Sequence, residues 1–406
     1  MLVSLDLLCE CEAGDRVNYS LHLITSRDVS GFPGYPMPRE YPVYPSRDQV
    51  LDYLNRFADE FGLRELITFR TAVTACMPEG GRDGWLVETS DGGRRHYDGV
   101  LLANGHLWDP NVPSLAQDFE GVSMHSCHYR SCAQIDGDCV LVVGSGNSGC
   151  DLAVDAAQAG RQTSISIRAG HTFQPKAYFG RPRAELTWLS RLPVVLQERL
   201  ARVLVDVIVG RTSAYRGLPE PVTRNLNKQP PVINNLLLYW IQHGRISVVP
   251  GIRRISGKTV YFVDGTCQAF DAVLWATGFR VCLPFLDESL LRWQDGVPLR
   301  VAGMTVPVGM ERLYFVGLAA PRGAQLPAYS AQTRLIIKML RLDRFAQPGW
   351  IHQAFAREAP EARIDIIRPE WVRQMKRANR SVDAMLRTGR TVPGRAVPAA
   401  SAKAGR

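Results

Sequence analysis

The sequence lacks a C-x-x-C motif among its nine cysteines. Redox dithiols and structural zinc sites need thiolates at such spacing, so neither is predicted and no metal site is expected. Scattered thiols are typical of reduced cysteines in a cytoplasmic protein. Long apolar runs are also missing, since even the stretch 196–209 carries Glu, Arg and Asp, so no transmembrane helix is predicted. Residues 1–11 have no basic segment and no small-residue cleavage site, so no signal peptide is predicted.

A basic stripe interleaved with aromatic residues is missing too, although the 406 residues carry a net charge of +9. Much of the excess lies in the last residues, which are rich in Pro, Gly and Ala and which we expect to form a disordered basic tail over 386–406. The sequence therefore favours no nucleic-acid partner. A hydrophobic content of 46% and a charged content of 21% are ordinary for a globular protein, and the length suffices for two domains.

The most informative stretch is 139–151, where a short apolar run leads into a glycine-rich turn. β-branched residues in 139–143 predict a strand buried on both faces, and apolar positions in 147–160 predict a helix. Between them, glycines recur at the G-x-G-x-x-G spacing of a dinucleotide-binding turn. The turn consists of Gly144, Ser145, Gly146, Asn147, Ser148 and Gly149. We expect these residues to bind a pyrophosphate at the helix N-terminus.

The residue after the next strand distinguishes between the two nicotinamide cofactors. A second strand is predicted over 163–167, and Arg168 occupies the place where NAD enzymes carry an acidic residue for the ribose 2′-hydroxyl. A guanidinium cannot accept a hydrogen bond from a hydroxyl, but it can bind a 2′-phosphate. With Ser166 two residues earlier, the pattern predicts NADPH as the cofactor. A glycine turn in an ordinary α/β protein, beside a surface arginine, is the structural alternative.

Elsewhere the pattern predicts short strands and amphipathic helices with no internal repeat. Ser46 is the predicted N-cap of a helix over 47–61. Three tyrosines of the proline-rich loop 31–45, namely Tyr35, Tyr41 and Tyr44, either pack against the prolines or line a substrate channel. Further strands are predicted over 19–26, 67–76, 84–90, 97–104, 246–249, 258–263, 272–275 and 313–317, and further helices over 186–208, 236–243 and 330–340.

One stretch of the sequence resembles flavin-containing monooxygenases. Residues 119–130, from Phe119 to Arg130, match that family's F-x-G-x-x-x-H-x-x-x-Y-[RK] signature through Gly121, His125 and Tyr129, just before the glycine turn. Baeyer–Villiger monooxygenases carry Trp at the position of Tyr129, so the resemblance favours the branch that oxygenates nitrogen and sulfur. The similarity runs from about residue 19 to about residue 340, and it includes 103–106, 166–168, 276–279 and 315–318.

The resemblance implies an α/β protein with two Rossmann-like dinucleotide-binding domains, the NADPH domain being inserted in the FAD domain. It implies FAD that is reduced by NADPH and reacts with dioxygen, after which a C4a-hydroperoxyflavin transfers one oxygen atom to a small-molecule nitrogen or sulfur nucleophile. Ser26 stands where many members have an asparagine that stabilises the oxygenated flavin, so Ser26 is the implied catalytic residue. The implied cofactor contacts outside the glycine turn and Arg168 are Ser166, Val73, Asn104, Gly105, Thr277 and Gly278. A structural role is expected for His125.

The early part of the chain departs from the family pattern. Flavin-containing monooxygenases begin with a strand, a G-x-G-x-x-G turn and a helix for FAD, whereas the only early glycine here is Gly14. We therefore expect a truncated FAD domain, and a flavin-free remnant that binds NADPH at most is the alternative function. A pyridine nucleotide-disulfide reductase is disfavoured by the missing cysteine pair. The expected divisions are 1–130 and 277–345 for the FAD domain, 131–276 for the NADPH domain and 346–385 for C-terminal helices.

Overall fold

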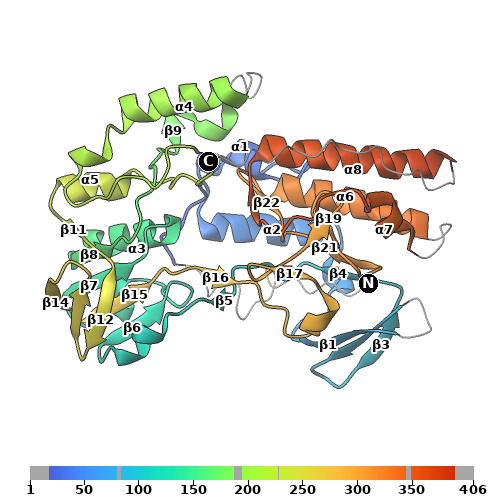
Figure 1. The fold of residues 1–406 in the computed structure, drawn as a ribbon, viewed down its shortest axis with the longest axis horizontal. Coiled ribbons are helices and arrows are strands. Elements are labelled where there is room, and N and C mark those ends of the chain that lie inside the picture. Colours follow the sequence, from blue (N-terminus) through green and yellow to red (C-terminus); the bar gives the residue numbers. More distant parts are fainter. Residues whose placement is uncertain (1–17, 80–83, 187–193, 227, 344–348, 389–406) are drawn as a thin grey trace, which may run out of the picture.

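The chain forms two α/β lobes that are joined by two extended linkers (Figure 1). The fold is that of a computed structural model, which describes residues 18–79, 84–186, 194–226, 228–343 and 349–388. One lobe contains a five-stranded parallel sheet, and the other contains a parallel strand pair, an antiparallel sheet and a layer of helices. The predicted α/β class is therefore confirmed. The early residues with Gly14 and the tail 389–406 lie outside the described residues.

The parallel sheet has the strand order β11-β8-β7-β15-β6. Its central strand β7 matches the predicted strand, and every neighbouring pair in the sheet is parallel. The chain moves outward from β7 through β8 to β11 and then returns to the other side for β15. The strands are β6 (Val122–His125), β7 (Cys139–Val143), β8 (Gln162–Ser166), β11 (Ile246–Val249) and β15 (Ala272–Trp275). This order places a change of winding direction beside β7, where open α/β sheets bind ligands.

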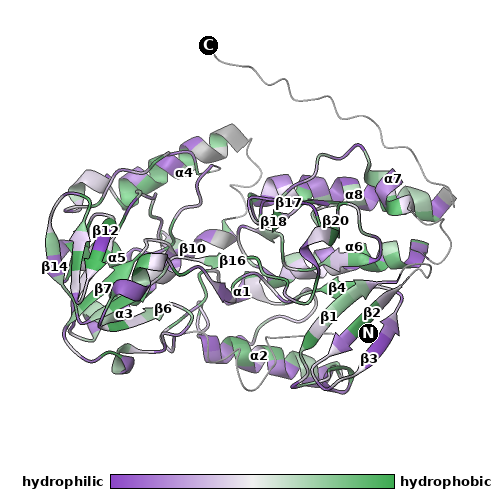
Figure 2. Cartoon of the chain, turned by 60° about the horizontal axis from the view of Figure 1, so that its bottom comes forward, coloured by the Kyte–Doolittle hydropathy of each residue, from purple (hydrophilic) through white to green (hydrophobic). Residues whose placement is uncertain are grey.

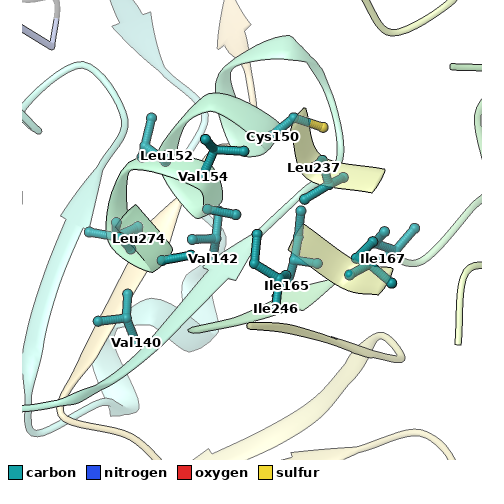
Figure 3. Packing of buried hydrophobic residues seen from close by; sticks show 14 of the residues in the cluster. Val140, Val142, Cys150, Leu152, Val154, Ile165, Ile167, Leu237, Ile246 and Leu274 are labelled. Carbon is teal, nitrogen blue, oxygen red and sulfur yellow. The ribbon is translucent and has the colours of Figure 1, made fainter. Parts of the chain in front are cut away.

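Both faces of the parallel sheet are buried, which explains the continuous apolar run in β7. On one face Val140 and Val142 pack with α3 (Asn147–Gln158) and α5 (Leu236–Gln242) in a single core (Figure 3). On the other face Leu141 packs against an antiparallel sheet of β12 (Ile252–Ser256), β13 (Thr259–Phe262) and β14 (Cys267–Ala269). The sequence pattern predicted β13 but not β12, because the exposed face of β12 is rich in Arg and Ser rather than regularly alternating.

The parallel sheet includes a strand that precedes the expected domain boundary. β6 pairs with β15, from Val122 opposite Ala272 to His125 opposite Trp275. The expected division at 130/131 separates β6 from its sheet, so a boundary before β6 fits the strand pairing better. The signature that ends at Arg130 therefore begins inside this lobe rather than between the lobes.

The second lobe is built around the parallel pair of β4 (Val100–Leu102) and β21 (Leu313–Phe315). Because β4 precedes the parallel-sheet lobe and β21 follows it, that lobe is inserted into this one, as predicted. The antiparallel sheet β1 (Val73–Pro78), β2 (Trp85–Thr89) and β3 (Arg94–Tyr97) packs beside the pair. Residues 80–83, in the predicted turn between β1 and β2, lie outside the described residues.

Three helices cover the second lobe and share a large apolar core with β19–β21. They are α6 (Leu326–Asp343), α7 (Trp350–Phe355) and α8 (Arg368–Thr388). α8 continues beyond the expected end of the C-terminal helices at 385. Its amphipathic pattern holds to that point, with Val382 and Met385 buried against the core.

The first described residues form an irregular segment and two helices. The predicted strand over 19–26 is wrong, because this stretch makes only an isolated bridge between His22 and Ser46 before α1 (Arg27–Ser30). The predicted helix over 47–61 is confirmed as α2 (Arg47–Glu60), and Ser46 caps it in a capping box with Gln49. The tyrosines of the proline-rich loop pack rather than line a channel, since Tyr35 contacts the aromatic rings of α2 and Tyr41 is buried.

Two short strands, β5 (Asp109–Pro110) and β16 (Phe279–Arg280), pair antiparallel where the chain crosses between the lobes. The remaining elements are α4 (Val194–Ile208), β9 (Ala177–Tyr178), β10 (Arg181–Pro182), β17 (Trp293–Gln294), β18 (Val297–Pro298), β19 (Arg300–Val301), β20 (Val306–Pro307), β22 (Ala320–Pro321) and β23 (Asp365–Ile366). Part of the predicted helix 186–208, residues 187–193, lies outside the described residues. None of the helices among the described residues is both long and apolar enough to cross a membrane.

Candidate nucleotide-binding site

The glycine turn lies at the carboxyl edge of the parallel sheet. In register, Val143 at the end of β7 is opposite Trp275 of β15 and Ser166 of β8. The chain therefore leaves three adjacent strands at the same edge. The Gly144 backbone N–H donates to the Ser166 carbonyl at 3.1 Å, which holds the start of the turn against β8. This edge is the usual ligand-binding position of such sheets.

Two glycines of the turn are required by close backbone contacts. Gly144 has φ of 109°, and a Cβ there would lie 2.4 Å from the Ala276 carbonyl oxygen. A Cβ on Gly149 would lie 2.0 Å from the Gly144 carbonyl oxygen. No real side chain tolerates such distances to backbone atoms. These glycines therefore allow the turn and the close packing of α3 on the sheet.

The second glycine of the turn is open to solvent. A Cβ on Gly146 would meet no heavy atom within 4 Å. Gly146 is also the N-cap of α3, with no side-chain cap, and Ser148 in the first turn of α3 is exposed. The first backbone N–H groups of a helix without a cap are available to an anion. The space in front of Gly146 is therefore open, as the second glycine of a dinucleotide-binding turn requires.

The side chain of Asn147 has a structural partner. Its Oδ1 accepts a hydrogen bond from the Ile233 backbone N–H at 2.8 Å. One turn further along α3, Asp151 accepts from Asn234 Nδ2 at 2.7 Å. These two bonds fasten the segment before α5 to the N-terminal turns of α3. A role of the Asn147 side chain in cofactor binding is therefore less well supported than a role of its backbone N–H.

Ser166 and Arg168 differ in their surroundings. Ser166 is buried, and its hydroxyl donates to the Pro250 carbonyl at 2.8 Å, so the structure gives this hydroxyl a partner in the neighbouring strand connection. Arg168 is exposed, and within the described part of the chain no ion pair engages it. A free guanidinium at the carboxyl end of β8 is placed to bind a phosphate. We therefore keep Arg168 and not the Ser166 side chain as the expected 2′-phosphate ligand.

Thr277 and Gly278 form the turn that follows β15. The Thr277 hydroxyl donates to the Asn111 carbonyl at 2.6 Å, and the Asn111 backbone N–H donates to the Gly278 carbonyl at 2.9 Å. Gly278 is exposed with φ of 82°. These bonds tie the two linkers together beside the β5–β16 pair. Backbone atoms, rather than the Thr277 side chain, are thus left to contact a cofactor.

His125 of the signature joins this linker junction from the end of β6. Its Nδ1 accepts from the Cys127 backbone N–H at 3.3 Å, so Nε2 carries the proton and donates to the Gly278 carbonyl at 3.0 Å. The ring also packs edge-on against Phe279. Burial lowers the pKa of His125, which favours the neutral ring. The expected structural role fits this geometry.

Replacing His125 with alanine should destabilise the protein by about 1–3 kcal/mol, because it removes a buried hydrogen bond and leaves the Cys127 N–H without a partner. Because the pKa of His125 is lower in the folded than in the unfolded chain, the unfolded chain takes up the proton first as the pH falls. The free energy of unfolding of the wild type therefore decreases below about pH 6.5. Urea unfolding at several pH values measures both effects. The difference between wild type and H125A should shrink in acid, and a difference that grows in acid would contradict the assignment of a neutral ring.

Tyr129, the last aromatic residue of the signature, bonds to α3 through Asp155. It is fully buried, and its hydroxyl donates to Asp155 Oδ2 at 2.5 Å. The other oxygen of Asp155 accepts from the Ser20 hydroxyl at 3.0 Å. Burial and the bond to Asp155 raise the pKa of Tyr129, so the phenol remains a donor. Tyr129 thus stabilises the position of α3, the helix that follows the glycine turn.

Replacing Tyr129 with phenylalanine should cost about 1–3 kcal/mol of unfolding free energy, because Asp155 loses its buried donor. Replacing Ser20 with alanine should cost under about 0.5 kcal/mol, since Ser20 is exposed. Chemical denaturation of both variants, with a Y129F/D155N double-mutant cycle, measures the coupling. Equal losses for the two single variants would show that the Tyr129 hydroxyl is not the stronger contact.

The residues expected to contact FAD lie on several segments of the second lobe. Asn104 and Gly105 follow β4 at its carboxyl end, and Asn104 Nδ2 donates to the Cys282 carbonyl at 3.4 Å. Gly105 is exposed with φ of 75°. Val73 begins β1, beside a bulge opposite Thr89. Ser26 lies at the N-terminus of α1. The structure thus places Asn104 and Gly105 next to the second linker, and among the described residues no hydrogen bond joins Val73 or Ser26 to them.

Lys176 has partners from three segments of the chain. Its Nζ donates to the Leu23 carbonyl at 3.4 Å and lies 5.5 Å from the ring centre of Tyr44. Burial lowers the pKa of Lys176, and the charge of Asp151 opposes that shift. Burial raises the pKa of Asp151 in turn.

The parallel sheet, the open glycine turn at a helix N-terminus and the arginine after the next strand define a dinucleotide-binding α/β protein. A model of the family described as flavin-binding monooxygenase-like matches residues 10–348. The chain belongs to this family. Membership supports FAD and NADPH as its cofactors.

The curated relatives are longer than this chain. Flavin-containing monooxygenase 3 of Oryctolagus cuniculus is 27% identical over 334 residues, which cover 78% of this chain and 63% of the relative. Flavin-containing monooxygenase 5 of Rattus norvegicus is 30% identical over 332 residues, which cover 78% of this chain and 62% of the relative. The chain therefore spans less than two thirds of the length of these relatives.

Solved structures share the fold at lower identity. A flavin-containing monooxygenase from Stenotrophomonas maltophilia has a TM-score of 0.59 and 23% identity, covering 82% of this chain and 88% of that chain. Cyclohexanone monooxygenase with bound ε-caprolactone has a TM-score of 0.67 and 16% identity, covering 92% of this chain and 90% of that chain. These similarities confirm the architecture of two Rossmann-like lobes.

Proposed function

We propose that this chain is an NADPH-dependent flavin monooxygenase that transfers one oxygen atom from dioxygen to a soft nitrogen or sulfur nucleophile. The observation that carries the proposal is the open Gly146 at the N-terminus of α3, together with the exposed Arg168 that follows β8, in a member of this family. Tyr129 in the signature supports nitrogen and sulfur as the oxygenated atoms. The proposed substrate is a small molecule, and dioxygen is the second substrate.

The NADPH site in this proposal uses backbone atoms for the pyrophosphate and one side chain for the 2′-phosphate. Gly144, Gly146 and Gly149 shape the turn, and the N–H groups of Asn147 and Ser148 would donate to phosphate oxygens. Arg168 would bind the 2′-phosphate. We assign the NADPH-binding domain to 131–276 together with β6, because β6 belongs to the same sheet.

The residues present in the second lobe fit a bound flavin at two points. Ser26 is fully buried, and its hydroxyl has no hydrogen-bond partner among the described residues. A buried hydroxyl without a partner is costly, so a polar ligand atom near Ser26 would relieve that cost. Gly105 is exposed at the end of β4, where a cofactor can approach the backbone. We propose the remainder of the FAD domain as 1–121 and 277–345, with α7 and α8 as the C-terminal helices.

The chain's own residues would bind, orient and shield the reacting groups, and bound FAD supplies the electron and oxygen transfer chemistry. Ser26 would orient a polar atom of the flavin through its hydroxyl. The turn at Thr277 and Gly278, held by His125 and Asn111, would fix the linker between the two cofactor sites.

The test is to purify the 406-residue protein and record its absorbance spectrum with and without NADPH. The proposal expects a yellow protein whose flavin band is bleached by NADPH without oxygen and returns on aeration, with oxygenated amine or thioether formed in turnover. A colourless protein that still binds NADPH would support the alternative of a flavin-free remnant. A yellow protein that oxygenates cyclic ketones but neither amines nor thioethers would contradict the nitrogen and sulfur assignment.

A further inference from the structure

The positive charge of the chain is concentrated in its C-terminal part. Residues 368–406 contain ten Lys and Arg residues and two acidic residues, so they supply eight of the nine net charges. The described portion of this stretch is α8, which packs beside α6 on the second lobe (Figure 1). Hydrophilic residues recur along α8 in Figure 2. The proposed oxygenase function makes no use of this charge.

An ion pair lies where α6 and α8 meet, and the exposed cations of both helices can be located relative to it. Lys338 Nζ of α6 lies 2.8 Å from Asp383 Oδ1 of α8, and it donates to Asn379 Oδ1 at 2.9 Å. On an α-helix, a residue three or four positions from Lys338, Asn379 or Asp383 lies on the same side of the helix as that residue. The cations at such spacing are Arg334 and Arg341 on α6, and Lys376, Arg380 and Arg387 on α8. We call these five residues the basic face.

All five residues of the basic face are exposed, and in the described part of the chain none has an acidic partner. Asp383, the acidic residue where the two helices meet, is already paired with Lys338. The α8 members span about 16 Å of helix at 1.5 Å per residue. Unpaired like charges so close together repel each other, and an anionic partner would relieve this repulsion.

Two exposed apolar side chains lie among the cations. Ile337 is 43% exposed, three residues after Arg334, and Leu386 is 39% exposed, three residues after Asp383. No exposed aromatic residue accompanies the cations on α6 or α8 within the described residues. Cations interleaved with aliphatic side chains suit a lipid surface, whereas nucleic-acid surfaces commonly add aromatic stacking.

We infer that the basic face is a docking surface for an anionic lipid bilayer. The five cations would lie over the headgroups of acidic phospholipids, and Ile337 and Leu386 would contact the interface. Binding of this kind is peripheral and depends on salt, because it rests on screened charge. It places the second lobe next to the membrane and leaves the glycine turn of the other lobe unconstrained.

Co-sedimentation of the full-length purified protein with vesicles tests this inference. Vesicles of phosphatidylcholine with phosphatidylserine should bind the protein, vesicles of phosphatidylcholine alone should not, and added salt should release it. The variant K376E/R380E/R387E should bind on the order of a hundredfold more weakly, since each basic residue near an acidic surface contributes about fivefold. Far-UV circular dichroism and thermal unfolding confirm that the variant is folded.

A matched control separates the basic face from overall charge. Lys228, Arg245 and Arg253 are exposed cations of the other lobe, and K228E/R245E/R253E changes the net charge equally. This control should bind acidic vesicles within about threefold of wild type. Equal loss in both triple variants, or no preference of the wild type for acidic vesicles, overturns the inference. Binding to duplex DNA in preference to acidic vesicles also overturns it and assigns the face to nucleic acid.

Discussion

Replacing Gly149 with alanine should abolish NADPH binding and destabilise the protein by about 3 kcal/mol, because the new Cβ would lie 2.0 Å from the Gly144 carbonyl oxygen. The Gly144 oxygen is a backbone atom, and the new Cβ would be fixed to the backbone of α3. Neither atom can therefore move without separating α3 from the sheet. The helix N-terminus would then no longer point at the carboxyl edge of β7. Thermal unfolding and titration with NADPH, followed by the change in protein fluorescence, measure the two losses.

Gly146→Ala is the matched control for this prediction. A Cβ at Gly146 meets no protein atom within 4 Å, so the variant should unfold at the wild-type temperature. Its NADPH affinity should still fall, because the methyl group would occupy the space where the pyrophosphate approaches the backbone. We expect a loss of about tenfold or more, corresponding to about 1.4 kcal/mol. Unchanged NADPH affinity in G146A would show that the cofactor binds elsewhere.

Replacing Arg168 with glutamine should raise the KM for NADPH about tenfold to a hundredfold and leave the KM for NADH unchanged. Hydrogen bonds to a charged group contribute about 1.5–3 kcal/mol, and only NADPH carries the 2′-phosphate that would receive them. The stability should not change, since Arg168 is exposed and no described residue pairs with it. Steady-state rates of NADPH and NADH oxidation measure the ratio directly.

Two further variants sharpen the Arg168 experiment. R168K keeps the charge but loses the planar fork, so its preference for NADPH should fall between those of wild type and R168Q. Arg245→Gln removes an exposed cation from the same lobe and should change neither KM. If R245Q raised the KM for NADPH as much as R168Q does, the effect would come from the overall positive charge of the lobe and not from a specific contact.

The sequence predicted those elements in which local signals agree with the tertiary environment. β7, α3 and the glycine turn were placed within about two residues, because a strand buried on both faces and a turn with required glycines leave a clear pattern. The capping box of α2 was readable for the same reason. The stretch 19–26 was mistaken for a strand because it alternates, although no neighbouring strand is available to pair with it beyond the bridge at His22.

The site residues divide in the same way. The glycines and Arg168 were identified from spacing along the chain, since the turn and the strand end are local features. The hydrogen-bond partners of Ser166, Thr277 and His125 could not be identified in this way, because each lies at least 84 positions away along the chain. These partners are Pro250, Asn111 and Gly278, respectively. Each of these bonds gives the side chain a partner within the protein, and the cofactor contacts expected of Ser166 and Thr277 stay predictions.

The sequence by itself determined that this protein has a dinucleotide turn, an arginine suited to NADPH and a family signature, because each is a short pattern whose chemistry depends on adjacent residues. Only the tertiary structure decided which of these groups remain free. It showed that Gly146 is open, that the Ser166 hydroxyl is engaged, and that His125 and Tyr129 hold elements together. It also showed that α6 packs against α8, so that Lys338 pairs with Asp383, a residue distant along the chain.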